Sequence, residues 1–129
     1  MKGEFMKKTV FLVDDDIDLV EQNTMVLEEQ GFSVVSAYTA QAALKKLEDI
    51  KPDILVLDVM MEHRTAGFVL ARELGRKYPE LPVIILSGDP DKVNWIGESE
   101  DAWDQVVKFL DKPIKPDKLA NEIQKVIKE

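Results

Sequence analysis

Short apolar runs alternate along the chain with segments in which apolar residues recur every three or four positions. The runs are short and rich in β-branched side chains, which is typical of strands, whereas the intervening periodicity is typical of helices. Strands that alternate with helices indicate an α/β fold built on a parallel sheet. The predicted strands are Thr9–Val13, Phe32–Ala37, Ile54–Leu57, Val83–Leu86 and Val106–Leu110.

Helices are predicted to follow these strands, and local signals indicate where they begin and end. Asp16 or Asp18 can cap the first helix, which is expected to stop before Gly31, and Thr39 can cap the second. The segment Gly88–Gln105 has no readable helix boundaries. The apolar faces are predicted to consist of Ile17, Val20, Thr24 and Leu27 in the first helix, Ala42, Ala43 and Leu47 in the second, Val69, Leu70, Leu74 and Tyr78 in a helix from about Gly67 to Tyr78, and Leu119, Ile123, Val126 and Ile127 in a last helix over Asp117–Ile127.

Three of the predicted strands stop at charged residues. Asp14, Asp15 and Asp16 follow the first strand, Asp58 follows the third and Lys112 follows the fifth. Because the carboxyl ends of parallel strands lie at one edge of a sheet, where α/β proteins bind their ligands, we expect these side chains to meet. Crowded carboxylates raise one another's pKa, so the cluster needs a cation, either a divalent metal with oxygen ligands or Lys112. The arrangement favours phosphoryl chemistry on an aspartate.

The composition is that of one globular domain. The chain has 129 residues, of which 45% are apolar, and no apolar run approaches the length of about 18 residues that a membrane helix requires. The first residues contain no apolar stretch suited to a signal peptide, so a cytoplasmic location is expected. A net charge of −8 argues against nucleic acid as a direct partner, and the absence of cysteine excludes disulfides and thiol catalysis.

Four motifs occur in order, namely FLVDDD from Phe11, PDILVLDVMM from Pro52, PVIILSG from Pro82 and FLDKPI from Phe109. With them the chain resembles, over almost its whole length, the receiver domain of two-component response regulators. The resemblance implies a flavodoxin-like, doubly wound (βα)5 sandwich with a five-stranded parallel sheet in the order 2-1-3-4-5. We therefore expect residues 6–129 to form a receiver domain, preceded at residues 1–5 by an N-terminal extension or a cloning remnant.

The resemblance also implies a role for each residue of the strand-end cluster and its surroundings. Asp58 is expected to be the phosphoacceptor, and Asp14, Asp15 and Asp58, with the backbone carbonyl of Met60, are expected to hold Mg²⁺ or Mn²⁺. Ser87 and Lys112 are expected to bind the phosphoryl group, with a cis peptide bond between Lys112 and Pro113. Ser87 and Phe109 are expected to form the switch, and Met60 and Asp89 to tune dephosphorylation.

The implied function is a phosphorylation-switched signalling module. A sensor histidine kinase or phosphotransfer protein would supply the phosphoryl group. The surface of the fourth helix, fifth strand and fifth helix would then change to regulate a downstream target protein or an output domain. Homodimerisation on phosphorylation is a further expectation. The chain would catalyse only its own phosphorylation and dephosphorylation, and no direct contact with nucleic acid or membrane is expected.

Two other functions stay open on the sequence. The long Glu62–Ala66 loop and Gly88–Gln105 segment would suit a degenerate receiver that acts as a constitutive protein-interaction module. A haloacid-dehalogenase-type phosphohydrolase would use Asp14 as nucleophile and Asp16 as acid, but the chain has no room for a cap domain, and Asp58 would have no role. Asp16 is more simply explained as a helix cap, and His63 as a solvated loop residue.

Overall fold

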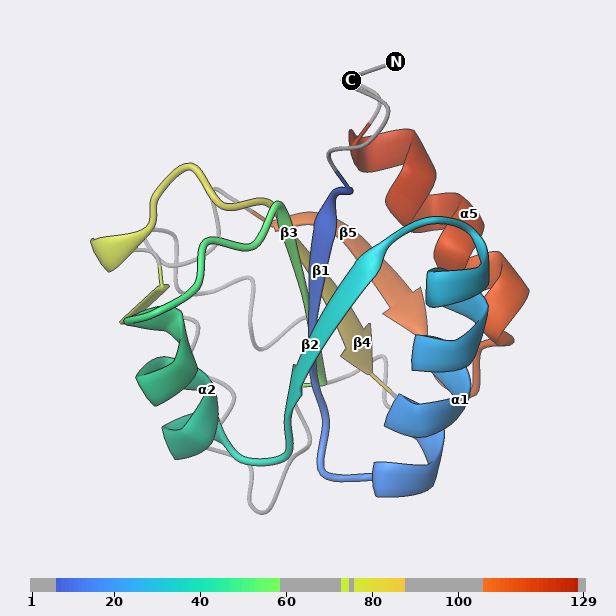
Figure 1. Cartoon of the computed structure of the whole chain (residues 1–129), viewed down its shortest axis with the longest axis horizontal. Coiled ribbons are helices and arrows are strands. Elements are labelled where there is room, and N and C mark those ends of the chain that lie inside the picture. The colour runs from blue at the N-terminus through green and yellow to red at the C-terminus, as the bar shows by residue number, and fades with distance from the viewer. Residues whose placement is uncertain (1–6, 59–72, 75, 88–105, 128–129) are drawn as a thin grey trace.

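The computed structural model describes residues 7–58, 73–74, 76–87 and 106–127 of the chain. Within them, five parallel strands form one sheet in the order β2-β1-β3-β4-β5 (Figure 1). Each strand begins and ends within one residue of its predicted position, and the predicted flavodoxin-like α/β fold is confirmed. The strands span Thr9–Val13 (β1), Ser33–Ala37 (β2), Ile54–Asp58 (β3), Val83–Ser87 (β4) and Val106–Asp111 (β5).

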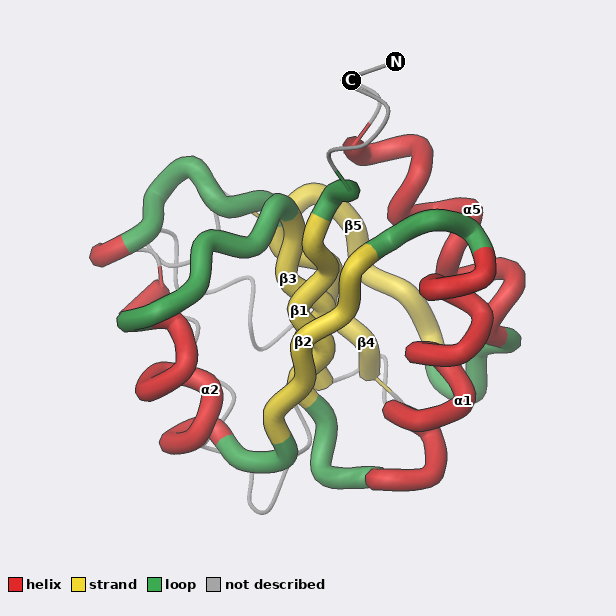
Figure 2. The backbone as a smooth tube through the Cα atoms, in the orientation of Figure 1, coloured by secondary structure: helices red, strands yellow, loops and turns green. Residues whose placement is uncertain are grey.

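Helices cover both faces of the sheet. α1 (Ile17–Glu29) and α5 (Pro116–Ile127) lie on one face and α2 (Ala40–Leu47) lies on the other, as Figures 1 and 2 show. Successive strand residues face opposite sides, so alternate residues of β1 contribute to two buried clusters, one packed with α1 and α5 and one with α2. Burial on both faces explains why the central strands are unbroken apolar runs in the sequence.

α1 begins at its predicted cap but buries a different set of residues. The Asp16 carboxylate accepts a hydrogen bond from the Leu19 N–H at 3.1 Å, which confirms Asp16 as the N-cap. The prediction that Ile17 belongs to the apolar face is wrong, because its side chain is 52% exposed. Ile17 is the first residue of the helix and lies before the part of α1 that packs on the sheet. The buried residues of that part are Val20, Asn23 and Leu27.

The start of α2 is fixed by Thr39, whose Oγ1 accepts a hydrogen bond from the Ala42 N–H at 3.0 Å. Such a cap satisfies an N–H that has no partner within the helix. Thr39→Ala is expected to lower the free energy of unfolding by about 1 kcal/mol, whereas Thr39→Ser keeps the acceptor oxygen and most of the stability. Urea denaturation measures both variants, and equal losses would show that the cap contributes nothing.

α5 is joined to β5 by an ion pair. Glu122 Oε1 lies 2.7 Å from Lys108 Nζ, and this contact with the ammonium lowers the pKa of the Glu122 carboxyl. Pro116 takes the first helical position, where its missing N–H leaves no intrahelical hydrogen bond unmade. Leu119 and Ile123 are buried as predicted, so apolar packing and the ion pair both hold α5 on the sheet.

Two predicted segments fall mainly outside the described residues. Of the helix expected from about Gly67 to Tyr78, residues 73–74 and 76–77 have helical backbone, and Leu74 is buried. The Gly88–Gln105 segment and the Glu62–Ala66 loop, which contains His63, lie outside the described residues. Among the helices that the structure does describe, none has the length and apolar character to cross a membrane.

Candidate functional site

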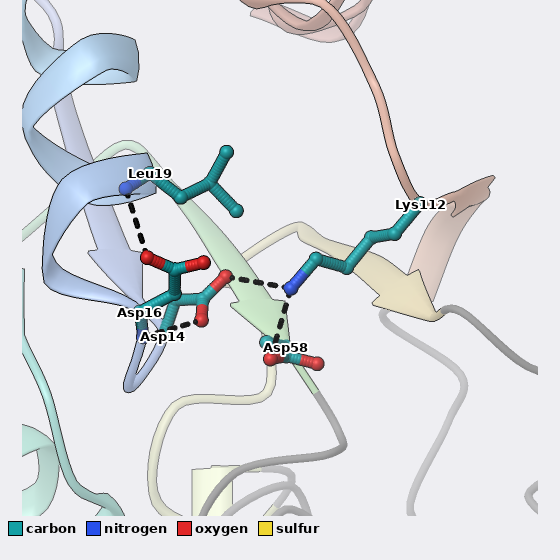
Figure 3. Close-up of polar contacts among 5 residues, drawn as sticks. All are labelled: Asp14, Asp16, Leu19, Asp58 and Lys112. Carbon is teal, nitrogen blue, oxygen red and sulfur yellow. Dashed lines mark hydrogen bonds and ion pairs between the residues drawn. The ribbon is translucent and has the colours of Figure 1, made fainter.

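The carboxyl ends of β1, β3 and β5 bring three charged side chains together (Figure 3). Asp14 directly follows β1, Asp58 ends β3 and Lys112 directly follows β5. The Lys112 Nζ lies 3.1 Å from Asp14 Oδ2 and 3.2 Å from Asp58 Oδ2. The predicted meeting of these three side chains is therefore confirmed.

Lys112 reaches across the sheet to make both contacts. β4 lies between β5 and β3, so a long side chain is needed to span the distance. Figure 3 shows the Lys112 side chain extending from the end of β5 toward the carboxylates of Asp14 and Asp58. The Lys112–Pro113 peptide bond is cis, as the resemblance implies.

Burial and charge together set the protonation of the cluster. Asp14 and Asp58 are only 4% and 3% exposed. Burial raises the pKa of Asp14 to about 6, and the Asp58 charge adds to the rise, while the Asp16 N–H and Lys112 oppose it. Burial alone would lower the pKa of Lys112, but the charges of Asp58 and Asp14 outweigh it and raise that pKa. Lys112 is therefore an ammonium group at neutral pH.

Three carboxylates converge closely enough to share a metal ion. Asp14, Asp15 and Asp58 each offer a carboxylate oxygen, and these three atoms all lie within 4.8 Å of one another. Asp15 is exposed and the other two are buried, so the set is accessible from solvent. Carboxylate oxygens are ligands that Mg²⁺ and Mn²⁺ prefer, and three of them converge here. These residues fit a hard divalent cation.

The other predicted site residues are described to different extents. Asp16 is outside the metal set, since its carboxylate caps α1. Ser87 ends β4, where its backbone pairs with Asp111; its side chain lies outside the described part of the structure, as do Met60 and Asp89. Phe109 lies on β5 with its side chain 43% exposed, so its ring faces outward in this structure.

One contact that shapes the site is not predicted from the sequence. The Asp16 N–H donates a hydrogen bond to Asp14 Oδ1 at 3.0 Å, so the backbone before α1 holds the Asp14 carboxylate (Figure 3). An aspartate that accepts from the N–H two residues further on forms a common local turn, so the Asp14-Asp15-Asp16 run contains a signal for it. These consecutive residues have separate tasks, because Asp14 contacts Lys112, Asp15 extends the carboxylate set and Asp16 caps the helix.

Known proteins share the sequence pattern of this chain. Residues 10–124 match the family model of the response regulator receiver domain. The response regulator GtcR of Aneurinibacillus migulanus is 31% identical over 122 residues, which cover 92% of this chain and 47% of GtcR. The transcriptional regulatory protein CssR of Bacillus subtilis is 32% identical over 123 residues, which cover 95% of this chain and 52% of CssR. The chain belongs to the family of response regulator receiver domains and spans about half the length of these two relatives.

Solved structures share the fold. The receiver domain of a Francisella response regulator matches with a TM-score of 0.80 and 26% identity, over 95% of this chain and 98% of that one. A CheY-like receiver domain protein from Methanospirillum hungatei matches with a TM-score of 0.82 and 22% identity, over 95% of this chain and 94% of that one. Both likenesses agree with the five-stranded sheet and its order.

Proposed function

We propose that Asp58 accepts a phosphoryl group from a sensor histidine kinase or a phosphotransfer protein, in a reaction that depends on Mg²⁺ or Mn²⁺. The observation that best supports this is the Lys112 ammonium held between the Asp14 and Asp58 carboxylates at the carboxyl edge of the sheet. Asp58 ends β3, which lies between β1 and β4, so its carboxylate stands in the middle of that edge. A donor placed over the edge would meet Asp58 with positive charge beside it.

The proposed reaction exchanges one bond at phosphorus. An oxygen of the Asp58 carboxylate attacks the phosphorus of a phosphohistidine, the P–N bond breaks, and the leaving imidazole nitrogen takes its electron pair and then a proton. Negative charge on the transferring group makes fixed positive charge the main catalytic requirement. Lys112 supplies one such charge, because its ammonium already lies 3.2 Å from an Asp58 oxygen.

The metal ligands are proposed to be Asp14, Asp15 and Asp58, with the backbone carbonyl of Met60. When bound, a divalent ion supplies charge neutralisation at the phosphoryl oxygens. The chain's own part is to hold these carboxylates close together. For Asp14, Lys112 and the Asp16 N–H favour the charged form of the carboxyl and oppose the rise in its pKa that burial causes.

The proposed output is a change on a surface made of the expected fourth helix, β5 and α5. We assign the switch to Ser87 and Phe109. When Ser87 closes on the phosphoryl group, the aromatic ring turns inward, and the half-exposed ring of Phe109 would then bury apolar surface. This surface is proposed to regulate a downstream target protein or output domain and to support homodimerisation after phosphorylation. Met60 and Asp89 are proposed to tune dephosphorylation.

Residues 6–129 are proposed to form the receiver domain, with residues 1–5 as an extension. A cytoplasmic location is proposed because the receiver family implies it. The chain would catalyse its own phosphorylation and dephosphorylation and no reaction on a metabolite.

Intact mass spectrometry tests the proposed reaction. Acetyl phosphate with Mg²⁺ is expected to add a single phosphoryl group, which EDTA prevents and Asp58→Asn removes. Asp53→Asn is the matched control. Asp53 directly precedes β3, at the amino ends of the strands and away from Asp58, so its loss should leave the adduct. No adduct under any condition would favour the constitutive interaction module, and an adduct that persists in Asp58→Asn would point to Asp14.

A further inference from the structure

Among the strands that the structure describes, β2 forms one edge of the sheet. It lies at the end of the sheet order, and within the described residues its only paired strand is β1. The Ser33 N–H donates to the Lys8 carbonyl at 2.9 Å, and the Ala37 carbonyl accepts from the Asp14 N–H at 3.2 Å. Groups alternate in direction along a strand, so the backbone of Ser33, Val35 and Ala37 faces β1. The N–H and C=O groups of Val34 and Ser36 therefore face the open edge.

Lys46 forms a hydrogen bond with one of these outward-facing backbone groups. Its Nζ, on α2, donates a hydrogen bond to the Ser36 carbonyl. Within the described part of the chain, the structure records no partner for the Ser36 N–H or for the N–H and C=O of Val34. A strand added to this edge would need the Ser36 carbonyl as an acceptor and would have to displace the lysine. Charged side chains, especially lysine, are among the features that protect exposed strand edges in native proteins.

The partner that fits this edge is β2 of a second copy. In antiparallel pairing about Val35, Val34 lies opposite Ser36 of the second copy, and each residue exchanges N–H and C=O with the other. The Ser36 carbonyl of each copy then accepts one hydrogen bond from the other copy. The strand reads Ser-Val-Val-Ser-Ala, so no like charges oppose each other across the two-fold axis.

The surface beside this edge also suits a partner. Met25 and Tyr38 are 66% and 38% exposed, and both line a groove of about 370 Å³ between α1 and β2. Ser36 of β2 lines the same groove. A second sheet placed edge to edge would cover part of this apolar surface, which adds to the hydrogen bonds gained.

We propose that the β2 edge is a self-pairing surface and that Lys46 keeps it closed by occupying the Ser36 carbonyl. Removing the ammonium opens the edge to antiparallel pairing of two copies through β2. The inference is independent of the phosphoryl chemistry, and this contact differs from a dimer formed through β5 and α5.

Disulfide trapping tests the proposal, because the chain has no cysteine of its own. In the proposed pairing Val35 faces Val35 of the second copy as a non-hydrogen-bonded pair, with Cα atoms about 4.5 Å apart, within disulfide range. Under mild oxidation, Val35→Cys with Lys46→Met is expected to give at least about tenfold more disulfide dimer than Val35→Cys alone. Val35→Cys with Lys45→Met is the matched control and should behave like Val35→Cys alone.

Two results would overturn the proposal. Equal trapping in all three proteins would show that Lys46 does not close the edge, and no trapping in any would show that the edge does not self-pair. Sedimentation velocity on cysteine-free variants keeps the test independent of Val35→Cys. A concentration-dependent dimer is expected for Lys46→Met and absent for Lys46→Arg, which keeps the charge. Identical sedimentation of these two variants would contradict the proposal, with circular dichroism confirming that both are folded.

Discussion

Asp14→Asn is expected to stabilise the metal-free protein at neutral pH, even though it removes a proposed metal ligand. The Asp14 carboxyl is buried, and its pKa rises from 3.8 to about 6, first because of burial and then because of the Asp58 charge. The folded protein therefore binds the Asp14 proton more tightly than the unfolded chain does. The free energy of unfolding falls as the pH rises from about 4 to about 6. Above pH 6 the total loss is about 3 kcal/mol.

Asp14→Asn removes the carboxyl that titrates in this range, so the gain in stability over the parent chain should depend on pH. Urea denaturation in EDTA is expected to show little difference between Asp14→Asn and the parent chain near pH 3.5. The variant should be more stable by about 3 kcal/mol above pH 7. Asp15→Asn controls for the change in net charge at an exposed position. A difference between Asp14→Asn and the parent chain that does not change with pH would contradict the expected effect of burial on Asp14.

Lys112→Met is expected to have the opposite effect. Removing the ammonium leaves the buried carboxylates of Asp14 and Asp58 close together without their shared cation. Breaking a buried ion pair from one side typically lowers the free energy of unfolding by about 3 kcal/mol, and a loss of that order is expected at pH 7 in EDTA. Added Mg²⁺ should recover part of the loss, because a divalent ion would replace the missing positive charge.

A double variant separates this effect from a general loss of packing. In Asp14→Asn the cluster has one carboxylate fewer, so Lys112→Met should cost less stability there than in the parent chain. Lys108→Met is the matched control, because Lys108 pairs with Glu122 away from the cluster. Equal costs of Lys112→Met in both backgrounds, with no response to Mg²⁺, would show that the side chain stabilises the fold by packing alone.

The sequence predicts the sheet well for a physical reason. β1 and β3 are buried on both faces, and such strands leave unbroken β-branched and apolar runs that are hard to misplace. The meeting of Asp14, Asp58 and Lys112 follows from the topology, because parallel strands place their carboxyl ends at one edge. Asp16 and Thr39 are recognisable as caps because cap chemistry is local.

Features that depend on tertiary contacts are harder to predict. Ile17 has the spacing of a buried residue but is exposed, whereas Asn23 is buried, because packing rather than periodicity decides both. The contact of Lys46 with the Ser36 carbonyl joins a helix to a strand edge and has no local sequence signal. The outward position of the Phe109 ring is likewise a property of the fold. The roles of Ser87, Met60 and Asp89 stay predictions.

The most direct test of the central claim locates the phosphoryl group on the chain. Borohydride reduces an aspartyl phosphate to homoserine with release of phosphate, and unmodified aspartate is not reduced. After treatment with acetyl phosphate and Mg²⁺, peptide mass spectrometry is expected to find homoserine at position 58 and aspartate at positions 14 and 15. Homoserine at position 14 or 15, or none at position 58 in protein that carries the adduct, would contradict the assignment of Asp58 as the phosphoacceptor.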